Sequence, residues 1–300
     1  MLYNPMNKQH LNSCPACGSN SFRHFSDVPD HYFSKEVFRI EECNQCGLRF
    51  TQDRPDAENI DAYYDSGNYA SHDSQGKTSL FQKVYNIARD QMLNHKYHLV
   101  RQFKPEWKQV LDYGTGEGFF VEFLHKKGIE AQGIEPSELA RKNFSRRTGK
   151  ELFASAEALP AGMTFQAISL WHVLEHIHEL RPTMEQLCAR LEKKGIMVIA
   201  VPNQQSMDAK DFGKNWAAWD VPRHLYHWED KSLSTFMESL GLKKIYTTQL
   251  PLDPFYIGLI SARYAGMNML SGIWKGFQSY LHGKKHKNEG STLLSIWMKS

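Results

Sequence analysis

The stretch VLDYGTGEG (residues 110–118) decides the fold of this chain. An apolar pair leads into Asp112, three glycines follow at alternate positions, and apolar residues then recur at helical spacing through Leu124. This pattern predicts a β-strand, a tight glycine turn and an α-helix. Glycines allow positive φ and let a ligand lie against the main chain. The helix start adds N–H groups that have no intrahelical partner. The stretch therefore predicts a cofactor-binding turn, with a purely structural turn as the alternative.

The spacing of the glycines separates two classes of cofactor. A dinucleotide site needs Gly-x-Gly-x-x-Gly, but here the third glycine comes one position early and Phe119 follows it. Asp112 would repel a pyrophosphate. A cofactor with a cationic amino-acid end suits both the glycine spacing and the carboxylate of Asp112. Asp112-x-Gly114-x-Gly116-x-Gly118 resembles motif I of the class I S-adenosylmethionine-dependent methyltransferases.

This resemblance implies an α/β fold with a doubly wound, seven-stranded, Rossmann-like methyltransferase sheet. The chain after the turn does alternate strand and helix patterns, as a parallel doubly wound sheet requires. Glu135 ends the second expected strand, 23 residues after Asp112, where an acidic side chain can reach a ribose diol; it matches motif II of the family. Residues 151–153 are expected to form a short third strand, and the following segment, with Glu157, resembles the one that borders the adenine. The cofactor-binding residues implied are Asp112, Tyr113, Gly114, Thr115, Gly116, Gly118, Glu135, Pro136, Ala156, Glu157 and Trp171.

Histidines follow the fourth expected strand, residues 165–171. The sequence HVLEHIHE (residues 172–179) resembles the strand-4 motif of the small-molecule branch of the family, which includes ubiquinone-pathway O-methyltransferases and methyltransferases of saccharide gene clusters. His172 and His176 share a face if a helix has begun, and a histidine there can remove a proton from a substrate hydroxyl. Some relatives place a divalent metal on Glu-x-x-Glu-His, but His172 stands at the first position of that pattern. Mutual structural pairing of these residues is the alternative.

A second group of histidines lies in the sequence PRHLYH (residues 222–227), a pattern frequent in the saccharide-cluster enzymes. Arg223 is expected to hold a phosphate or carboxylate bidentately, and His224 or His227 is a rival general base. The candidate catalytic residues are therefore His176, His172 and His224.

Four of the five cysteines form two Cys-x-x-Cys-Gly pairs, Cys14 with Cys17 and Cys43 with Cys46. Two such turns can complete a tetrahedral four-thiolate zinc site, so a structural zinc ribbon is expected over residues 1–52. A redox dithiol normally uses a single pair near a βαβ unit. Cys188 is expected to be a buried small hydrophobe.

Two further segments complete the expected domain organisation. Residues 53–107 are expected to form a helical linker or cap, in which Tyr64 and Tyr69 either cover the cofactor cleft or pack the ribbon against the methyltransferase domain, residues 108–300. A Trp-, Phe- and Lys-rich helical insertion is expected near residues 253–288. It predicts a lid or dimer contact, with a peripheral membrane contact as the alternative.

The amino-acid composition limits the functions that are expected for this chain. A 41% hydrophobic content provides a core without a run of transmembrane length. No secretory signal is visible, and paired cysteines favour a reducing compartment, the cytoplasm. We expect methyl transfer to a hydroxyl of a small polar acceptor, a sugar or nucleotide sugar, in saccharide biosynthesis. An RNA methyltransferase is an alternative, against which the net charge of only +3 speaks; a non-catalytic scaffold of a biosynthetic complex is another.

Overall fold

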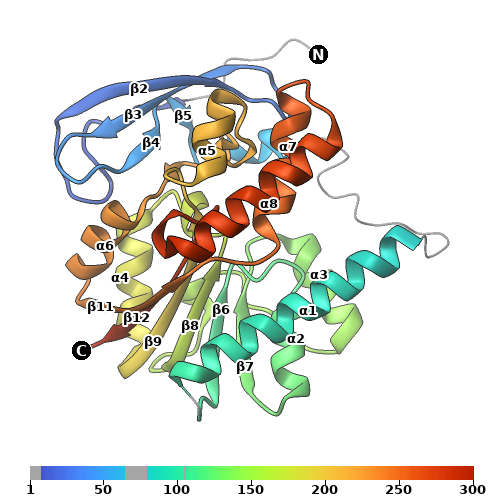
Figure 1. Cartoon of the computed structure of the whole chain (residues 1–300). Coiled ribbons are helices and arrows are strands. Elements are labelled where there is room, and N and C mark those ends of the chain that lie inside the picture. Colours follow the sequence, from blue (N-terminus) through green and yellow to red (C-terminus); the bar gives the residue numbers. More distant parts are fainter. Residues whose placement is uncertain (1–7, 65–79, 105) are drawn as a thin grey trace.

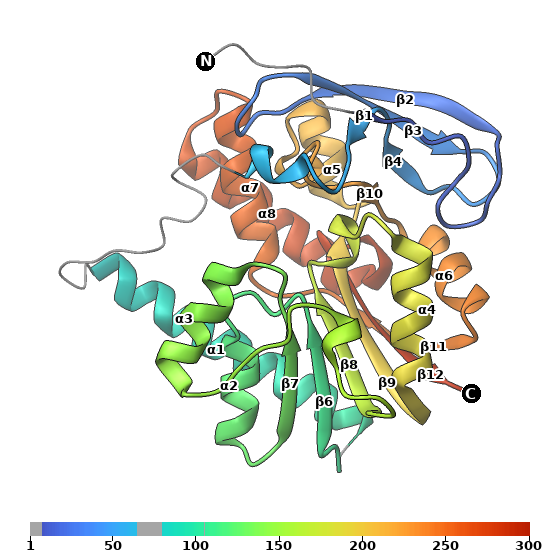
Figure 2. The same ribbon diagram turned by 180° about the vertical axis from the view of Figure 1, so that it is seen from behind.

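The computed structural model of the chain describes residues 8–64, 80–104 and 106–300 (Figure 1). Two sheets dominate it: a large central sheet, and a smaller sheet built mainly from the first 55 residues. The view from behind shows the smaller sheet lying above one end of the central sheet (Figure 2). The expected lid residue Tyr69 lies outside the described residues.

The central sheet has the order β11-β12-β9-β8-β6-β7. Its strands are β6 (Gln109–Tyr113), β7 (Glu130–Ile134), β8 (Phe165–Trp171), β9 (Leu191–Pro202), β11 (Leu242–Thr248) and β12 (Thr292–Lys299). Strands β6 to β9 pair in parallel, and β12 inserts antiparallel between β9 and β11. The mostly parallel, Rossmann-like α/β architecture implied by the sequence is therefore present.

Helices cover both faces of this sheet, and alternate strand residues supply the two cores. Val110 packs with α1 (Leu80–Phe103), α2 (Phe119–Lys126) and α3 (Glu138–Thr148), whereas Leu111 packs with α4 (Leu180–Arg190) and α6 (Asp230–Ser239). Neighbouring residues of a strand point to opposite faces. Because helices bury both faces of the sheet, the sequences of its buried strands are continuous apolar runs.

The expected count of seven strands is wrong for the described residues, which form a six-stranded central sheet. The third expected strand, residues 151–153, is reduced to a single bridge between Phe153 and Ile134. Phe153 donates to the Gly133 carbonyl and accepts from the Glu135 amide, each at 2.9 Å. The next bonds of this parallel ladder would use the Glu135 carbonyl and the Ser137 amide, but these groups bond instead to Arg141 Nη1 at 2.7 Å and to the Glu135 carboxylate at 2.9 Å.

The smaller sheet has the order β10-β4-β3-β2. Its strands are β2 (Phe22–Pro29), β3 (Val37–Cys43), β4 (Arg49–Thr51) and β10 (Tyr226–His227), beside a separate pair formed by β1 (Lys8–Gln9) and β5 (Arg54–Pro55). Strand β10 belongs to the loop after β9 and pairs antiparallel with β4, so that Tyr226 lies opposite Phe50. The N-terminal sheet thus incorporates a strand from the second half of the chain.

Two helices follow β11: α7 (Asp253–Tyr264) and α8 (Met269–Lys285), beside the short helix α5 (Met207–Phe212). The helices α7 and α8 pack closely because glycines meet at their contact. A Cβ atom added to Gly258 would lie 2.6 Å from the carbonyl oxygen of Gly272. No helix among the described residues is long and apolar enough to cross a membrane.

Candidate active site

The three glycines of the turn between β6 and α2 all have positive φ, from 58° to 72°. Two of them are needed for packing: a Cβ at Gly114 would lie 2.5 Å from Val173 Cγ2, and one at Gly118 would lie 2.3 Å from Phe144 Cδ2. Gly116 differs, because an added Cβ would meet nothing within 4 Å. The backbone at Gly116 is therefore open to approach by a ligand.

Glu135, at the end of β7, lies directly beside this open position. Its Oε2 accepts a hydrogen bond from the Gly116 amide at 2.8 Å, and its Oε1 accepts one from the Ser137 amide at 2.9 Å. The structure thus brings the acidic residue and the glycine turn together, as the sequence predicts. The carboxylate also fixes the segment of Pro136 and the N-cap of α3.

Asp112 is the penultimate residue of β6 and is 3% exposed. Its Oδ1 accepts a hydrogen bond from Ser169 Oγ at 2.6 Å, and burial raises the pKa of its carboxyl group despite this bond. The charge of Lys96 opposes that shift. A buried acid beside a cation is a typical functional-site feature.

Lys96 is a further candidate site residue, which was not predicted from the sequence. It projects from α1 with its Nζ 4.4 Å from the centre of the Trp171 ring, and burial lowers its pKa against the charges of Asp112 and Asp253. A signal was present in the sequence, because Lys96 shares the apolar helical face of Leu93 and Val100.

The remaining implied cofactor residues surround the same edge of the sheet. Trp171 meets Phe120 edge to face at 5.8 Å, and its buried Nε1 has no hydrogen-bond partner among the described residues. Ala156 and Glu157 lie in the 3-10 turn η2 (Ala156–Ala158). Glu157 accepts from Gln186 Nε2 at 3.1 Å. Burial raises the pKa of Tyr113, and the charge of Glu157 adds to the shift.

His172 follows β8 directly and has a φ of +57°. Its Nε2 lies 2.9 Å from Asp253 Oδ2, and its Nδ1 lies 3.5 Å from Glu175 Oε1. Thr292 also hydrogen-bonds to Asp253. Burial alone would lower the pKa of His172, but the two carboxylates outweigh it and raise that pKa to about 10. His172 is therefore an imidazolium at neutral pH. Asp253, far away in the sequence, was not predicted.

His176, unlike the protonated His172, has an uncharged ring. Burial and the neighbouring His224 lower its pKa to about 4, so it is neutral at pH 7. Its Nδ1 lies 3.0 Å from the Arg223 carbonyl oxygen and 3.0 Å from the Tyr64 hydroxyl. A carbonyl only accepts, so the proton is assigned to Nδ1 and the lone pair to Nε2.

His224 meets His176 with the ring centres 4.7 Å apart. Its Nδ1 lies 2.8 Å from the Ala218 carbonyl oxygen, which assigns the proton to Nδ1 in the same way. Glu175 is fully buried, and neither of its carboxylate oxygens has a hydrogen-bond partner among the described residues. One ligand atom from each of Glu175, His176 and His224 lies within 4.8 Å of the others. The structure thus brings two imidazoles and a buried carboxylate together.

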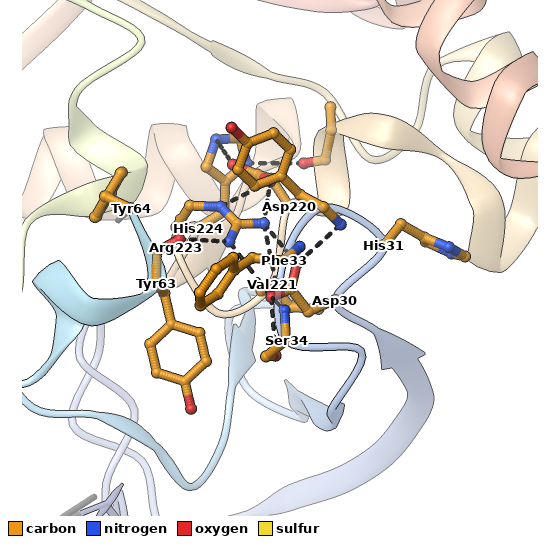
Figure 3. Close-up of polar contacts among 12 residues, drawn as sticks. Asp30, His31, Phe33, Ser34, Tyr63, Tyr64, Asp220, Val221, Arg223 and His224 are labelled. Atoms are coloured by element: carbon orange, nitrogen blue, oxygen red, sulfur yellow. Dashed lines mark hydrogen bonds and ion pairs between the residues drawn. The ribbon is translucent and has the colours of Figure 1, made fainter. Parts of the chain in front are cut away.

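The side chains of the two other candidate residues in the PRHLYH sequence, Arg223 and His227, do not reach this cluster. His227 lies in β10, and its Nε2 is 3.2 Å from Thr51 Oγ1. Arg223 is 1% exposed and pairs with Asp30 at 2.8 Å and Asp220 at 2.7 Å, as Figure 3 shows. The expectation that Arg223 holds a ligand phosphate or carboxylate is wrong, because two internal carboxylates occupy its guanidinium group.

The four paired cysteines converge in the smaller sheet. Cys14 Sγ lies 3.6 Å from Cys46 Sγ, Cys17 Sγ lies 3.5 Å from Cys43 Sγ, and all four sulfurs lie within 4.8 Å of one another. These distances exclude disulfides, whose sulfurs lie about 2 Å apart. Four thiolates around a tetrahedral zinc, each about 2.3 Å from the metal, lie about 3.8 Å apart. The donor set therefore fits zinc.

Known proteins resemble this chain in both sequence and fold. The sequence model of a family described as a methyltransferase domain matches residues 85–247, more than half of the chain. The ubiquinone biosynthesis O-methyltransferase of Azorhizobium caulinodans is 22% identical over 201 residues, which cover 63% of this chain and 74% of that protein. Its counterpart from Methylobacterium nodulans is 24% identical over 199 residues, 61% of this chain and 79% of that protein.

Two solved structures are similar at lower identity. A SAM-dependent methyltransferase from Archaeoglobus fulgidus has a TM-score of 0.46 and 19% identity, covering 73% of this chain and 98% of that one. Magnesium protoporphyrin IX methyltransferase from Synechocystis, with SAH bound, has a TM-score of 0.48 and 12% identity, covering 75% and 90%. On the family match, the chain belongs to the methyltransferase domain family and is a class I S-adenosylmethionine-dependent methyltransferase.

Proposed function

We propose that the enzyme methylates a hydroxyl group of a small polar acceptor, a sugar or nucleotide sugar, with His176 as general base. The observation that carries this proposal is the contact of the His176 and His224 imidazoles beside the buried carboxylate of Glu175, whose oxygens have no hydrogen-bond partner among the described residues. The cluster follows β8 at the carboxyl end of the parallel strands, where open α/β sheets bind their ligands.

In this proposal, residues of different charge bind different parts of the cofactor. Glu135, beside the open backbone of Gly116, suits a ribose diol. Asp112 suits the cationic amino group, and Lys96 offers a cation for the carboxylate of the same amino-acid end. Bound S-adenosylmethionine supplies an electrophilic methyl group, whose bond to sulfur breaks as the acceptor oxygen bonds to carbon, leaving the electron pair on sulfur. The neighbouring implied residues Tyr113, Gly114, Thr115, Gly118, Pro136, Ala156, Glu157 and Trp171 complete the proposed site.

The proton of the acceptor hydroxyl passes to Nε2 of His176 in this proposal. A histidine with a pKa of about 4 is a weak base, so the transfer needs the developing imidazolium to be stabilised. Glu175 provides this, because it is buried and ionised next to the ring. His224 is the second candidate base, and His172, already protonated at neutral pH, supplies fixed positive charge.

The four cysteines would hold a structural zinc, which braces the N-terminal sheet. Residues 1–52 would then form the ribbon, residues 53–107 the cap, and residues 108–300 the methyltransferase domain. Tyr64, whose hydroxyl lies 3.0 Å from His176 Nδ1, supports a role of the cap in the acceptor site. Thiolate ligands also favour a reducing compartment, the cytoplasm.

The curated relatives suggest a second acceptor class. Both are named ubiquinone biosynthesis O-methyltransferases, which favours an aromatic hydroxyl. Such an acceptor would use the same base. A divalent cation on Glu175, His176 and His224 is a second way to activate either acceptor, since two imidazoles and one carboxylate form a known metal-binding set.

The test is transfer of a labelled methyl group to a panel of sugars, nucleotide sugars and catechols. We expect product with one of the first two classes and its loss in His176→Ala, with cofactor binding retained. His178→Ala is the matched control, because the His178 ring lies outside the cluster and places its Nε2 3.1 Å from the Pro55 carbonyl oxygen. Full activity of His176→Ala would refute the assigned base, product from catechols alone would refute the sugar acceptor, and loss of activity with a chelator that spares the thiolate zinc would favour the cation.

A further inference from the structure

Helix α8 presents a continuous apolar surface to solvent. The residues of this α8 surface are Met269, Leu270, Ile273, Trp274, Phe277 and Leu281, with exposed fractions from 39% at Phe277 to 76% at Leu270. At 3.6 residues per turn they occupy one arc of about 140° around the helix. A contiguous patch of large apolar side chains on a solvent-exposed face marks an interaction site more often than singly scattered apolar residues do.

The orientation of α8 is the reverse of that of an ordinary surface helix. Its buried residues are Gly272, Gly276, Ser279 and Gly283, and the glycines allow close contact with α7. An amphipathic surface helix normally turns its large apolar residues to the core. Here small residues face the protein and the large ones face outward. Packing inside this chain therefore does not explain the Trp, Phe and Leu of α8.

The charge around the α8 surface is positive. Helix α8 contains no Asp or Glu. Lys284, Lys285 and Lys287 are exposed at its C-terminal end, and Arg263 is exposed at the end of α7. Two nearby acids pair with cations of α8 itself, Asp211 with Lys275 at 2.8 Å and Glu289 with His282 at 2.7 Å, and neither of these pairs involves the lysines at its C-terminal end.

We propose that the α8 surface docks the enzyme on a bilayer surface that contains anionic lipid. Trp, Phe and Leu on one face of a helix, with lysines beside them, are typical of helices that lie in a membrane interface. Lysines next to the apolar face can reach lipid headgroups while their stems stay on the apolar surface. This proposal concerns where the enzyme works and does not depend on the acceptor that it methylates.

The same charges argue against a second copy of the chain as the occupant. A parallel pair of α8 helices would bring the two lysine clusters together. An antiparallel pair would place each cluster against the partner's helix N-terminus, which carries partial positive charge. Since the α8 surface has no acidic residue to compensate, an anionic partner suits it better.

The test is co-sedimentation of the full-length protein with vesicles of phosphatidylcholine, with or without about one third phosphatidylglycerol. Three lysines near an anionic surface are expected to favour the anionic vesicles by about a hundredfold. Leu270→Gln/Trp274→Gln and Lys284→Glu/Lys285→Glu are each expected to lower that binding at least about tenfold. These side chains are exposed, and an unchanged melting temperature will show that the variants fold.

The control variants alter apolar side chains of similar exposure elsewhere. Ile87→Gln on α1 and Leu139→Gln on α3 change residues that are 59% and 57% exposed, and both are expected to bind vesicles like the parent protein. Equal binding of neutral and anionic vesicles, or undiminished binding by the α8 variants, would overturn the proposal. A dimer seen by light scattering that Leu270→Gln/Trp274→Gln dissociates would also overturn it and assign the surface to a second copy.

Discussion

The proposed cofactor edge and the proposed acceptor side of this enzyme are built in different ways. The cofactor edge comes mainly from residues 112–135, which run through one strand, one turn, one helix and the next strand. The acceptor side combines the neighbours Glu175 and His176 with Tyr64, His224 and Asp253, which come from distant segments of the sequence. A local motif therefore specifies the first, whereas the second depends on tertiary packing.

The N-terminal sheet is the main support of the acceptor side. Thr51 donates from its hydroxyl to the His224 carbonyl at 2.8 Å, and its amide bonds to the Leu225 carbonyl at 3.0 Å. Arg223 adds a buried ion pair to Asp30. None of these contacts involves the glycine turn, so the two parts of the site are expected to respond separately to substitution.

The largest effect should come from Cys43→Ser. A structural zinc contributes about 10–16 kcal/mol to folding of small zinc domains, so losing one thiolate should disorder the N-terminal sheet and the loop of His224. Methyl transfer should be abolished while the Kd for S-adenosylmethionine changes by less than about threefold, or about 0.7 kcal/mol. Zinc content, cofactor titration and transfer assays measure this.

Cys188→Ala is the control, because Cys188 lies outside the four-cysteine cluster. It should retain zinc and activity. Cofactor binding lost together with transfer in Cys43→Ser would show that the two parts of the site are not separate.

His176→Ala tests the acceptor side alone. Loss of a general base typically lowers kcat by about 10²–10⁴-fold, and the Kd for the cofactor should not change. Steady-state kinetics with the identified acceptor measures the first quantity, and calorimetry the second. An equal loss in His178→Ala would point to a general structural effect.

Gly118→Ala and Gly116→Ala compare packing with ligand access within the glycine turn. At both positions the alanine must adopt the left-handed backbone conformation, which lowers the free energy of unfolding by about 1–2 kcal/mol. Gly118→Ala should cost about 1–3 kcal/mol more, because its Cβ overlaps Phe144. Gly116→Ala should be the more stable of the two and yet bind the cofactor more weakly. Urea unfolding and calorimetry distinguish these outcomes, and equal unfolding free energies would contradict the assignment.

The smallest expected effect is the pH dependence conferred by His172. Its pKa is raised from 6.5 to about 10 in the folded protein, so its stabilising contribution is complete below pH 6.5 and is lost as the pH rises through about 10. Solvent reaches a side chain that is 36% exposed and weakens the effect. His172→Gln should therefore flatten the decline of unfolding free energy over this range. An identical decline in parent and variant would argue against the charged state of His172.

The sequence alone predicted the parts of the molecule that local pattern controls. The turn glycines, the position of Glu135 beside them and the convergence of four cysteines follow from spacing within short segments. The short third strand was wrong because a strand pattern does not reveal that the groups needed to extend it, the Glu135 carbonyl and the Ser137 amide, bond elsewhere.

The acceptor side was predicted only as a set of candidates. Arg223 and Asp30 are 193 residues apart, and no periodicity in the sequence indicates that they form a buried pair. Strand β10 has only two residues, which is too short for a strand pattern. Asp253 begins α7, where an acid is an ordinary helix-start residue. Its pairing with His172 follows from the way α7 packs, which local sequence does not encode.

The most direct test of the account is titration of S-adenosylmethionine into the parent enzyme, Glu135→Ala and His176→Ala. We expect equal affinity for the parent and His176→Ala, and at least about tenfold weaker binding by Glu135→Ala, equivalent to about 1.4 kcal/mol. Unchanged binding by Glu135→Ala, or a comparable loss in His176→Ala, would contradict the division of the site into a cofactor edge and an acceptor side.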